Sequence, residues 1–152
     1  MTLLDAQQYD PERERKRKVR IISIIILFGA LAIIVWWNRF WPEKRIAEKF
    51  FSALQKQNFT TAYGLYFADP NWQQHPQNHS QYPLNEFLQD WGTGGEWGVI
   101  KSFKIHGESN CPGGGSGVVV DVIVNNRTQH AQLYVDKSDN TISTPPCDLE
   151  FR

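Results

Sequence analysis

Residues 118–134 read VVVDVIVNNRTQHAQLY, and this stretch decides the fold of the domain that contains it. The even-numbered valines from Val118 to Val124 share one face of a β-strand, because successive side chains of a strand point to opposite sides. If Asn125 and Asn126 form a two-residue turn, Asp121 lies opposite His130, and the apolar residues of both strands face the same way. The stretch therefore predicts a β-hairpin with one buried face.

Working outward from the hairpin, the periodicity predicts further strands and, before them, helices. Residues 97–107 alternate between apolar and polar side chains, and residues 141–144 form a short last strand. Apolar residues recur at helical spacing over residues 43–57, 62–68 and 84–91. We therefore expect an α+β domain in which three helices pack on one face of a curved four-stranded antiparallel sheet.

The segment AEKFFSALQKQNFTTAYGLY, residues 47–66, carries a family resemblance. The residues that fit the family's core spacing are Ala47, Phe50, Ala53, Leu54, Ala62 and Tyr63. They resemble the opening helical pair of the NTF2-like (cystatin-like α+β) superfamily, and the resemblance extends over about residues 43–144. The resemblance implies a cone-shaped cavity between the helices and the sheet, in which related enzymes place Asp and His. It also implies a sheet face through which related domains often dimerise. Small membrane-tethered bacterial members are common, and the layout is similar to the longer periplasmic domains of type IV secretion components.

Residues 21–37, IISIIILFGALAIIVWW, predict a transmembrane helix that extends to residue 41. Residues 1–20 contain six basic side chains, whereas only four follow the span closely, so we expect a cytoplasmic N-terminus. A cleavable signal peptide is the competing interpretation, but WWNRFWPEK offers no small-residue cleavage site. We expect a single-pass signal anchor of the cell (inner) membrane, with a cytoplasmic tail (1–20) and an extracytoplasmic domain (42–152).

The balance of charge excludes one class of function. Residues 38–152 contain ten basic and twelve acidic side chains, a formal charge of −2, and no basic stripe. Nucleic-acid binding needs a concentrated positive surface, so we expect no nucleic-acid partner. The expected partners are the lipid bilayer and, through the sheet, a second copy or another protein.

The two cysteines, Cys111 and Cys147, both follow the predicted span. An oxidising compartment favours a disulfide between them, with two unpaired thiols as the alternative. The chain has no CxxC motif, so a disulfide here is expected to be structural.

Two arrangements of histidines are candidates for chemistry. His75 and His79 have the i, i+4 spacing of helical metal ligands, but Pro76 lies between them, so a solvated loop is expected. Asp121 and His130 are the weak catalytic candidates, because a carboxylate can orient an imidazole; a cross-strand surface pair is the simpler interpretation. We expect no metal site, no cofactor and, on balance, no enzymatic activity.

Two functions remain open at this stage. A half-apolar outer sheet face predicts a non-enzymatic interaction domain, an assembly or envelope component, and the apolar residues of that face are Ile100, Val119, Ile123 and Tyr134. The alternative is a small-ligand or enzymatic pocket of NTF2-like type, lined by Phe50, Tyr63, Tyr66, Phe87, Trp91 and Phe103.

Overall fold

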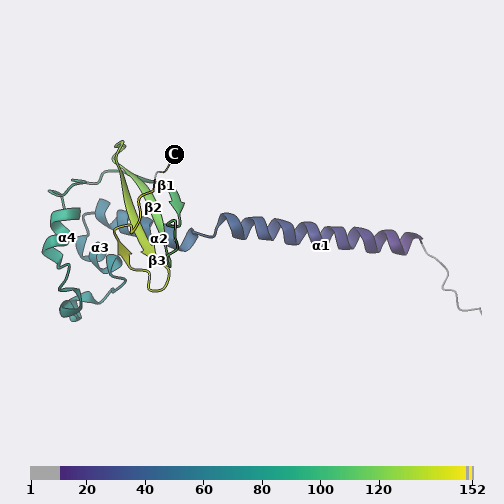
Figure 1. Ribbon diagram of the computed structural model, residues 1–152, viewed down its shortest axis with the longest axis horizontal. Coiled ribbons are helices and arrows are strands. Elements are labelled where there is room, and N and C mark those ends of the chain that lie inside the picture. Colours follow the sequence, from purple (N-terminus) through teal and green to yellow (C-terminus); the bar gives the residue numbers. More distant parts are fainter. Residues whose placement is uncertain (1–10, 150, 152) are drawn as a thin grey trace, which may run out of the picture. The chain divides into compact units, whose positions relative to one another are not determined.

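The computed structural model describes residues 11–149 and 151, and the chain divides into two compact units, Met1–Arg39 and Phe40–Arg152 (Figure 1). The described part of the first unit is helix α1, Pro11–Trp37. It contains a stretch that is long and apolar enough to cross a membrane, with a mean hydropathy of 2.6, and none of its residues is buried. The predicted apolar helix is therefore present, with the length and composition that a membrane span needs.

Three α-helices and two short 3₁₀ turns open the second unit. They are α2 (Trp41–Gln55), α3 (Phe59–Tyr66), η1 (Trp72–Gln74), η2 (Pro76–His79) and α4 (Leu84–Trp91). Pro42 occupies the first turn of α2, where its missing N–H costs no hydrogen bond. Asn58 caps α3, because its side-chain oxygen accepts a hydrogen bond of 3.1 Å from the backbone N–H of Thr61. The three predicted helices are confirmed, with slightly different ends.

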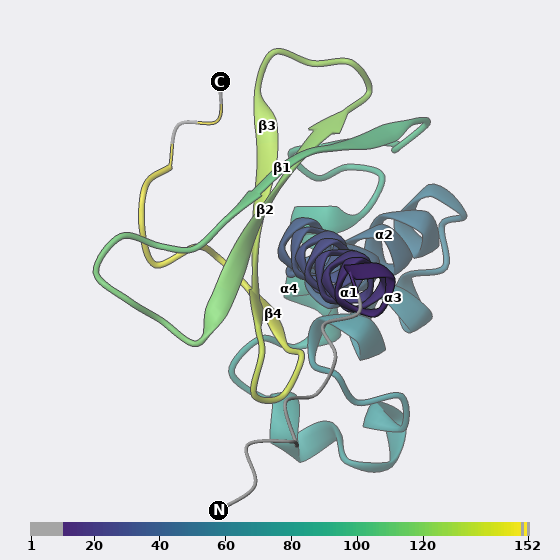
Figure 2. The same ribbon diagram turned by 90° about the vertical axis from the view of Figure 1, so that its right-hand side faces the viewer.

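A four-stranded antiparallel sheet follows, in the order β1-β2-β3-β4. Its strands are β1 (Phe103–Ser109), β2 (Gly117–Val124), β3 (His130–Asp136) and β4 (Ile142–Ser143). The even-numbered valines of β2 are buried against the helices, in one core with Phe50 and Phe51 of α2. Figure 2 shows α2 and α3 on one side of the sheet and the chain after β4 on the other. The α+β class and the sheet topology are confirmed.

The register of the β2–β3 hairpin differs from the prediction by two residues. Asp121 lies opposite Gln132, and His130 lies opposite Ile123. The predicted turn is present, because Asn125 and Asn126 both have positive φ and the backbone N–H of Arg127 donates to the carbonyl of Val124 across them. The pairs differ because residues 127–129 lengthen the connection before β3, and the Arg127 guanidinium there donates to the carbonyl of Glu96 at 2.9 Å. A shift of two residues leaves every side chain on its expected face, so the predicted faces of the hairpin are right although the pairs are not.

The first strand begins later than expected, because residues 97–102 are irregular. Asn125 holds this segment, since its side-chain oxygen accepts hydrogen bonds from the backbone N–H groups of Lys101 and Ser102. Ile100 is buried in the core beneath the helices. Its predicted place on the outer sheet face is therefore wrong.

A β-bulge interrupts β1 at His106. Ile105 pairs with Val122 and Gly107 pairs with Asp121, so His106 is the extra residue between two ladder pairs. Bulges of this kind turn a side chain away from the direction that a regular ladder would give it.

The end of the chain covers the outer sheet face. The predicted disulfide between Cys111 and Cys147 is present, and the residues after it form what we call the C-terminal strap (described residues 147–149 and 151). The strap packs on Val119 and Tyr134, and both are buried. The exposure expected for these two side chains is wrong, because the sequence pattern of the sheet gave no sign that the chain returns over this face. Ile123, the remaining apolar residue expected there, is half-buried.

Candidate metal centre

A buried carboxylate stands at the middle of the outer sheet face. Asp121 lies on the central strand β2 between two valines that face the helices, so its own side chain points to the opposite side. It has no exposed surface. A carboxylate without water contact is costly unless other groups satisfy its oxygens, so its partners identify the site.

Two histidines approach one oxygen of this carboxylate from the neighbouring strands. Nδ1 of His106, on β1, lies 2.9 Å from Oδ2 of Asp121, and Nδ1 of His130, on β3, lies 2.6 Å from the same atom. The imidazole side chains keep 31% and 23% of their surface exposed. The centre, which we call the sheet cluster (His106, Asp121 and His130), is thus closed beneath and open at its rim.

Gln132 and the strap fix the carboxylate from the side. The Gln132 side-chain amide lies 3.4 Å from Oδ1 of Asp121 and donates a 2.9 Å hydrogen bond to the carbonyl of Leu149 in the strap. The Phe151 ring packs so closely on Gly107 that a Cβ atom there would lie 2.8 Å from it. The residue beside His106 must therefore be glycine for the strap to lie where it does.

The geometry of the sheet cluster fits a metal ion. Among the described residues, this is the one group of three ligand atoms from His, Cys, Asp or Glu that all lie within 4.8 Å of one another. Ligand atoms at Zn–N and Zn–O distances of about 2.0–2.1 Å stand roughly 3.3 Å apart around a tetrahedral ion. The observed contacts of 2.9 and 2.6 Å would have to open by roughly 0.4 and 0.7 Å to admit one. Two imidazoles and a carboxylate are donors that suit zinc and its neighbours in the first transition row.

The sequence had brought together two of these three residues. Asp121 and His130 lie on one face and in contact, as expected, but they are diagonal rather than opposite. Their interpretation as a solvated surface pair is wrong, because the strap and the adjacent strands bury Asp121 completely. His106 was missed. Continuing the Phe103–Val124 pairing along β1 and β2 would have placed His106 opposite Asp121, so the signal was present in the β1–β2 register.

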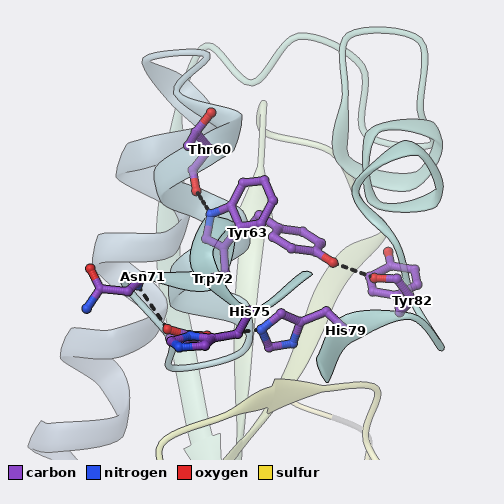
Figure 3. A network of polar contacts seen from close by, with 8 residues as sticks. Thr60, Tyr63, Asn71, Trp72, His75, His79 and Tyr82 are labelled. Atoms are coloured by element: carbon purple, nitrogen blue, oxygen red, sulfur yellow. Dashed lines mark hydrogen bonds and ion pairs between the residues drawn. The ribbon is translucent and has the colours of Figure 1, made fainter. Parts of the chain in front are cut away.

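A second cluster contains the chain's other two histidines. Nε2 of His79 lies 3.1 Å from Oδ2 of Asp69, and Nδ1 of His75 lies 3.8 Å from the same oxygen. Figure 3 shows the two imidazoles beside one another in the segment between α3 and α4. Together these three residues are called the loop cluster (Asp69, His75 and His79).

The environment of the loop cluster is aromatic on one side. The His79 ring lies 4.3 Å from the Phe67 ring and is buried, so its expected place in a solvated loop is wrong. The hydrogen bond with His79 lowers the pKa of the Asp69 carboxyl below its usual range, and burial opposes this shift. His75, by contrast, keeps 49% of its side-chain surface exposed, as expected for a loop residue.

The residues of the expected ligand pocket separate into two groups. Phe50, Tyr63 and Phe87 are buried in the core, where their rings meet edge to face. Tyr66 and Trp91 line a cleft of about 500 Å³ beside α4, whereas Phe103 lines a different hollow between α2 and β1. The expected six-residue pocket is therefore not a single cavity.

Comparisons with protein-family models, with curated proteins and with solved structures found no match. The site is therefore interpreted from its own geometry.

Proposed function

We propose that this protein is a membrane-anchored domain that binds one divalent transition-metal ion outside the cytoplasm, through His106, Asp121 and His130. The observation that carries the proposal is the convergence of two Nδ1 atoms on one oxygen of a fully buried carboxylate. Each ligand comes from a different strand of one sheet, so the backbone that holds them is rigid. Three protein ligands leave a position for water or another donor, which suits binding or transfer of the ion.

The surroundings support this assignment over a purely structural hydrogen-bond network. Metal ligands are commonly oriented by a second layer of hydrogen bonds, and Gln132 occupies that position beside Asp121. His106 contacts the carboxylate from the bulged position of β1, where regular ladder hydrogen bonds are lost. Both imidazoles keep part of their surface accessible, so an ion can enter from solvent.

The placement outside the cytoplasm belongs to the same proposal. Helix α1 supplies the anchor, and the dense basic residues before its apolar stretch favour a cytoplasmic N-terminus. The Cys111–Cys147 disulfide supports an oxidising compartment for the second unit. Membership of the NTF2-like superfamily stays a prediction, supported by the α2–α3 pair packed against an antiparallel sheet. Self-association through the outer face also stays a prediction, now centred on Ile123.

A competition titration tests the proposed function. The full chain, without a polyhistidine tag, is placed in maltoside micelles and competes with a chromophoric chelator for Zn²⁺. We expect one ion per chain, and His106→Asn and His130→Asn should each weaken binding by about 10- to 100-fold or more. His75→Asn is the matched control, because it removes an imidazole that contacts the other aspartate, and it should bind as the wild type does.

Two outcomes would contradict the proposal. One is a wild-type chain that fails to compete with a chelator of micromolar affinity. The other is a His106→Asn/His130→Asn double variant that folds, by circular dichroism, and still binds zinc like the wild type.

A further inference from the structure

A cleft lies at the open half of strand β3; it contains none of the three residues of the sheet cluster but shares Gln132 with its surroundings. Strand β4 pairs with β3 only at Tyr134 and Val135, so residues 130–133 have no strand partner on that side. Helix α4 and the segment after it form the opposite wall, and the cleft has a volume of about 500 Å³. That volume lies within the range of small-molecule sites.

Four aromatic side chains and two carboxylates form most of the lining. The aromatic residues are Tyr66, Tyr82, Trp91 and Trp97, and the acidic residues are Asp90 and Glu96. The remaining lining residues, all uncharged, include Gln132 and Ser143, and no Lys or Arg is among the described residues that line the cleft. The cleft is therefore electronegative as well as aromatic.

Asp90 is held in place by the aromatic wall. The Tyr82 hydroxyl donates a 2.6 Å hydrogen bond to Oδ2 of Asp90, and the rings of Tyr66 and Tyr82 lie 5.3 Å apart. Burial raises the pKa of Tyr66 and of Tyr82, and the neighbouring Asp90 raises both values further. The Asp90 carboxylate thus lies beside the aromatic residues of the lining, where its negative charge adds to that of the ring faces.

The contacts of Arg127, a cation beside the lining residues, leave this charge available. The Arg127 guanidinium lies over the Trp97 ring, 5.9 Å from its centroid, and donates to the backbone carbonyl of Glu96. The Glu96 carboxylate accepts one hydrogen bond, from the neutral amide of Gln129. Neither contact places a positive charge on Asp90.

We propose that this cleft binds an organic cation through its ammonium group. Aromatic faces attract ammonium ions most strongly when a carboxylate completes the cage and water is partly excluded. A primary ammonium can also donate to Gln132 or Ser143, whereas a quaternary ammonium relies on the rings and on Asp90. Two sources fit this chemistry: a free amine and the ethanolamine headgroup of a phospholipid.

Indole NMR signals of the full chain test the proposal. The protein is labelled with ¹⁵N-tryptophan and held in maltoside micelles, which contain no ammonium group, with a chelator present so that metal binding plays no part. Choline and ethanolamine are the soluble probes. We expect saturable shifts of the Trp91 and Trp97 signals, while Trp72, which donates from Nε1 to the carbonyl of Thr60, stays unchanged.

Matched ligands and variants identify the charge. 3,3-Dimethylbutan-1-ol has the shape of choline without its charge and should bind at least about tenfold more weakly. Asp90→Asn should weaken choline binding by a similar factor, whereas Glu86→Gln, one turn earlier on the same helix and not among the residues that line the cleft, should leave it unchanged. Equal binding of the neutral alcohol, or no saturable shift with either cation, would overturn the proposal.

A separate titration tests whether the ligand is a phospholipid headgroup. Short-chain phosphatidylethanolamine added to the micelles should give the same shifts at lower concentration than free ethanolamine if the headgroup is the ligand. Phosphatidylglycerol serves as the control lipid. If only the soluble amines shift Trp91 and Trp97, the cleft takes a free amine.

Discussion

The two histidine–aspartate clusters have the same composition but different supports. The sheet cluster takes its residues from three adjacent strands, and its Asp121 side chain is 1% exposed. The loop cluster takes its residues from a connection of short 3₁₀ turns, and its Asp69 side chain is 24% exposed. Both Nδ1 contacts of Asp121 are under 3 Å, whereas the His75 contact of Asp69 is 3.8 Å. Ladder hydrogen bonds between strands fix the first arrangement, whereas only short-range turn hydrogen bonds hold the backbone of the second.

The same residue types therefore form a candidate metal site only where the backbone holds them rigidly. Three ligands held within a few tenths of an ångström of productive geometry need a rigid frame. The loop cluster places one imidazole in contact and leaves the other near solvent. It is therefore expected to stabilise the connection between α3 and α4 rather than to hold an ion.

Removing the carboxylate of the sheet cluster should have the largest effect. Asp121→Ala removes a buried carboxylate that two imidazoles and Gln132 contact, and should lower the free energy of unfolding by about 3–5 kcal/mol. Denaturant titration of the full chain in micelles, with a chelator present, measures it. Asp69→Ala is the matched variant of the loop cluster and should cost clearly less. Equal losses of unfolding free energy in the two variants would show that the burial of Asp121 in the sheet adds no stability.

Opening the disulfide should have the next largest effect. Cys111→Ser/Cys147→Ser frees the strap and removes a covalent link between residues 36 positions apart, at a cost of about 2–4 kcal/mol. Because Leu149 in the strap accepts from Gln132, zinc affinity should also fall. Unfolding and zinc competition on the same preparation measure both effects. An unchanged zinc affinity in the folded variant would separate the strap from the metal centre.

A methyl group added at Gly107 should displace the strap with a smaller loss of stability than opening the disulfide. Gly107→Ala puts a Cβ atom against the Phe151 ring, which we expect to cost about 1–3 kcal/mol and to weaken zinc binding. Gly94→Ala is a suitable control, because a Cβ atom there meets no neighbour within 4 Å. Thermal unfolding of both variants checks the prediction, and equal melting temperatures would refute it.

Acid should have the smallest effect, and it should act on the loop cluster. The pKa of Asp69 is lower in the folded than in the unfolded chain, so its contribution to stability is present above the unfolded value of about 3.9 and is lost as pH falls through the folded pKa. The wild type should therefore lose part of its advantage over Asp69→Asn between about pH 5 and pH 3. Thermal unfolding across this range measures the difference, and a gap that is independent of pH would contradict it.

The sequence predicted the parts of the structure that depend on local periodicity. The apolar anchor, the helix after Pro42 and the alternating valines of β2 all have one dominant spacing, and the structure contains each of them. The pairing of the two cysteines also followed from their surroundings. The sheet cluster was beyond this reasoning because it depends on long-range placement. The β1–β2 register brings His106 to Asp121, and the strap buries a face that the strand pattern presents as half-polar.

X-ray absorption at the zinc edge tests directly whether His106, Asp121 and His130 bind the ion. On the zinc-loaded full chain, we expect a first shell of nitrogen and oxygen atoms at about 2.0–2.1 Å, with the outer scattering of two imidazoles. The His106→Asn/His130→Asn variant should lose that imidazole scattering, and His75→Asn should keep it. A shell of oxygen atoms alone in the wild type, or imidazole scattering that survives in the double variant, would contradict a zinc site on the sheet.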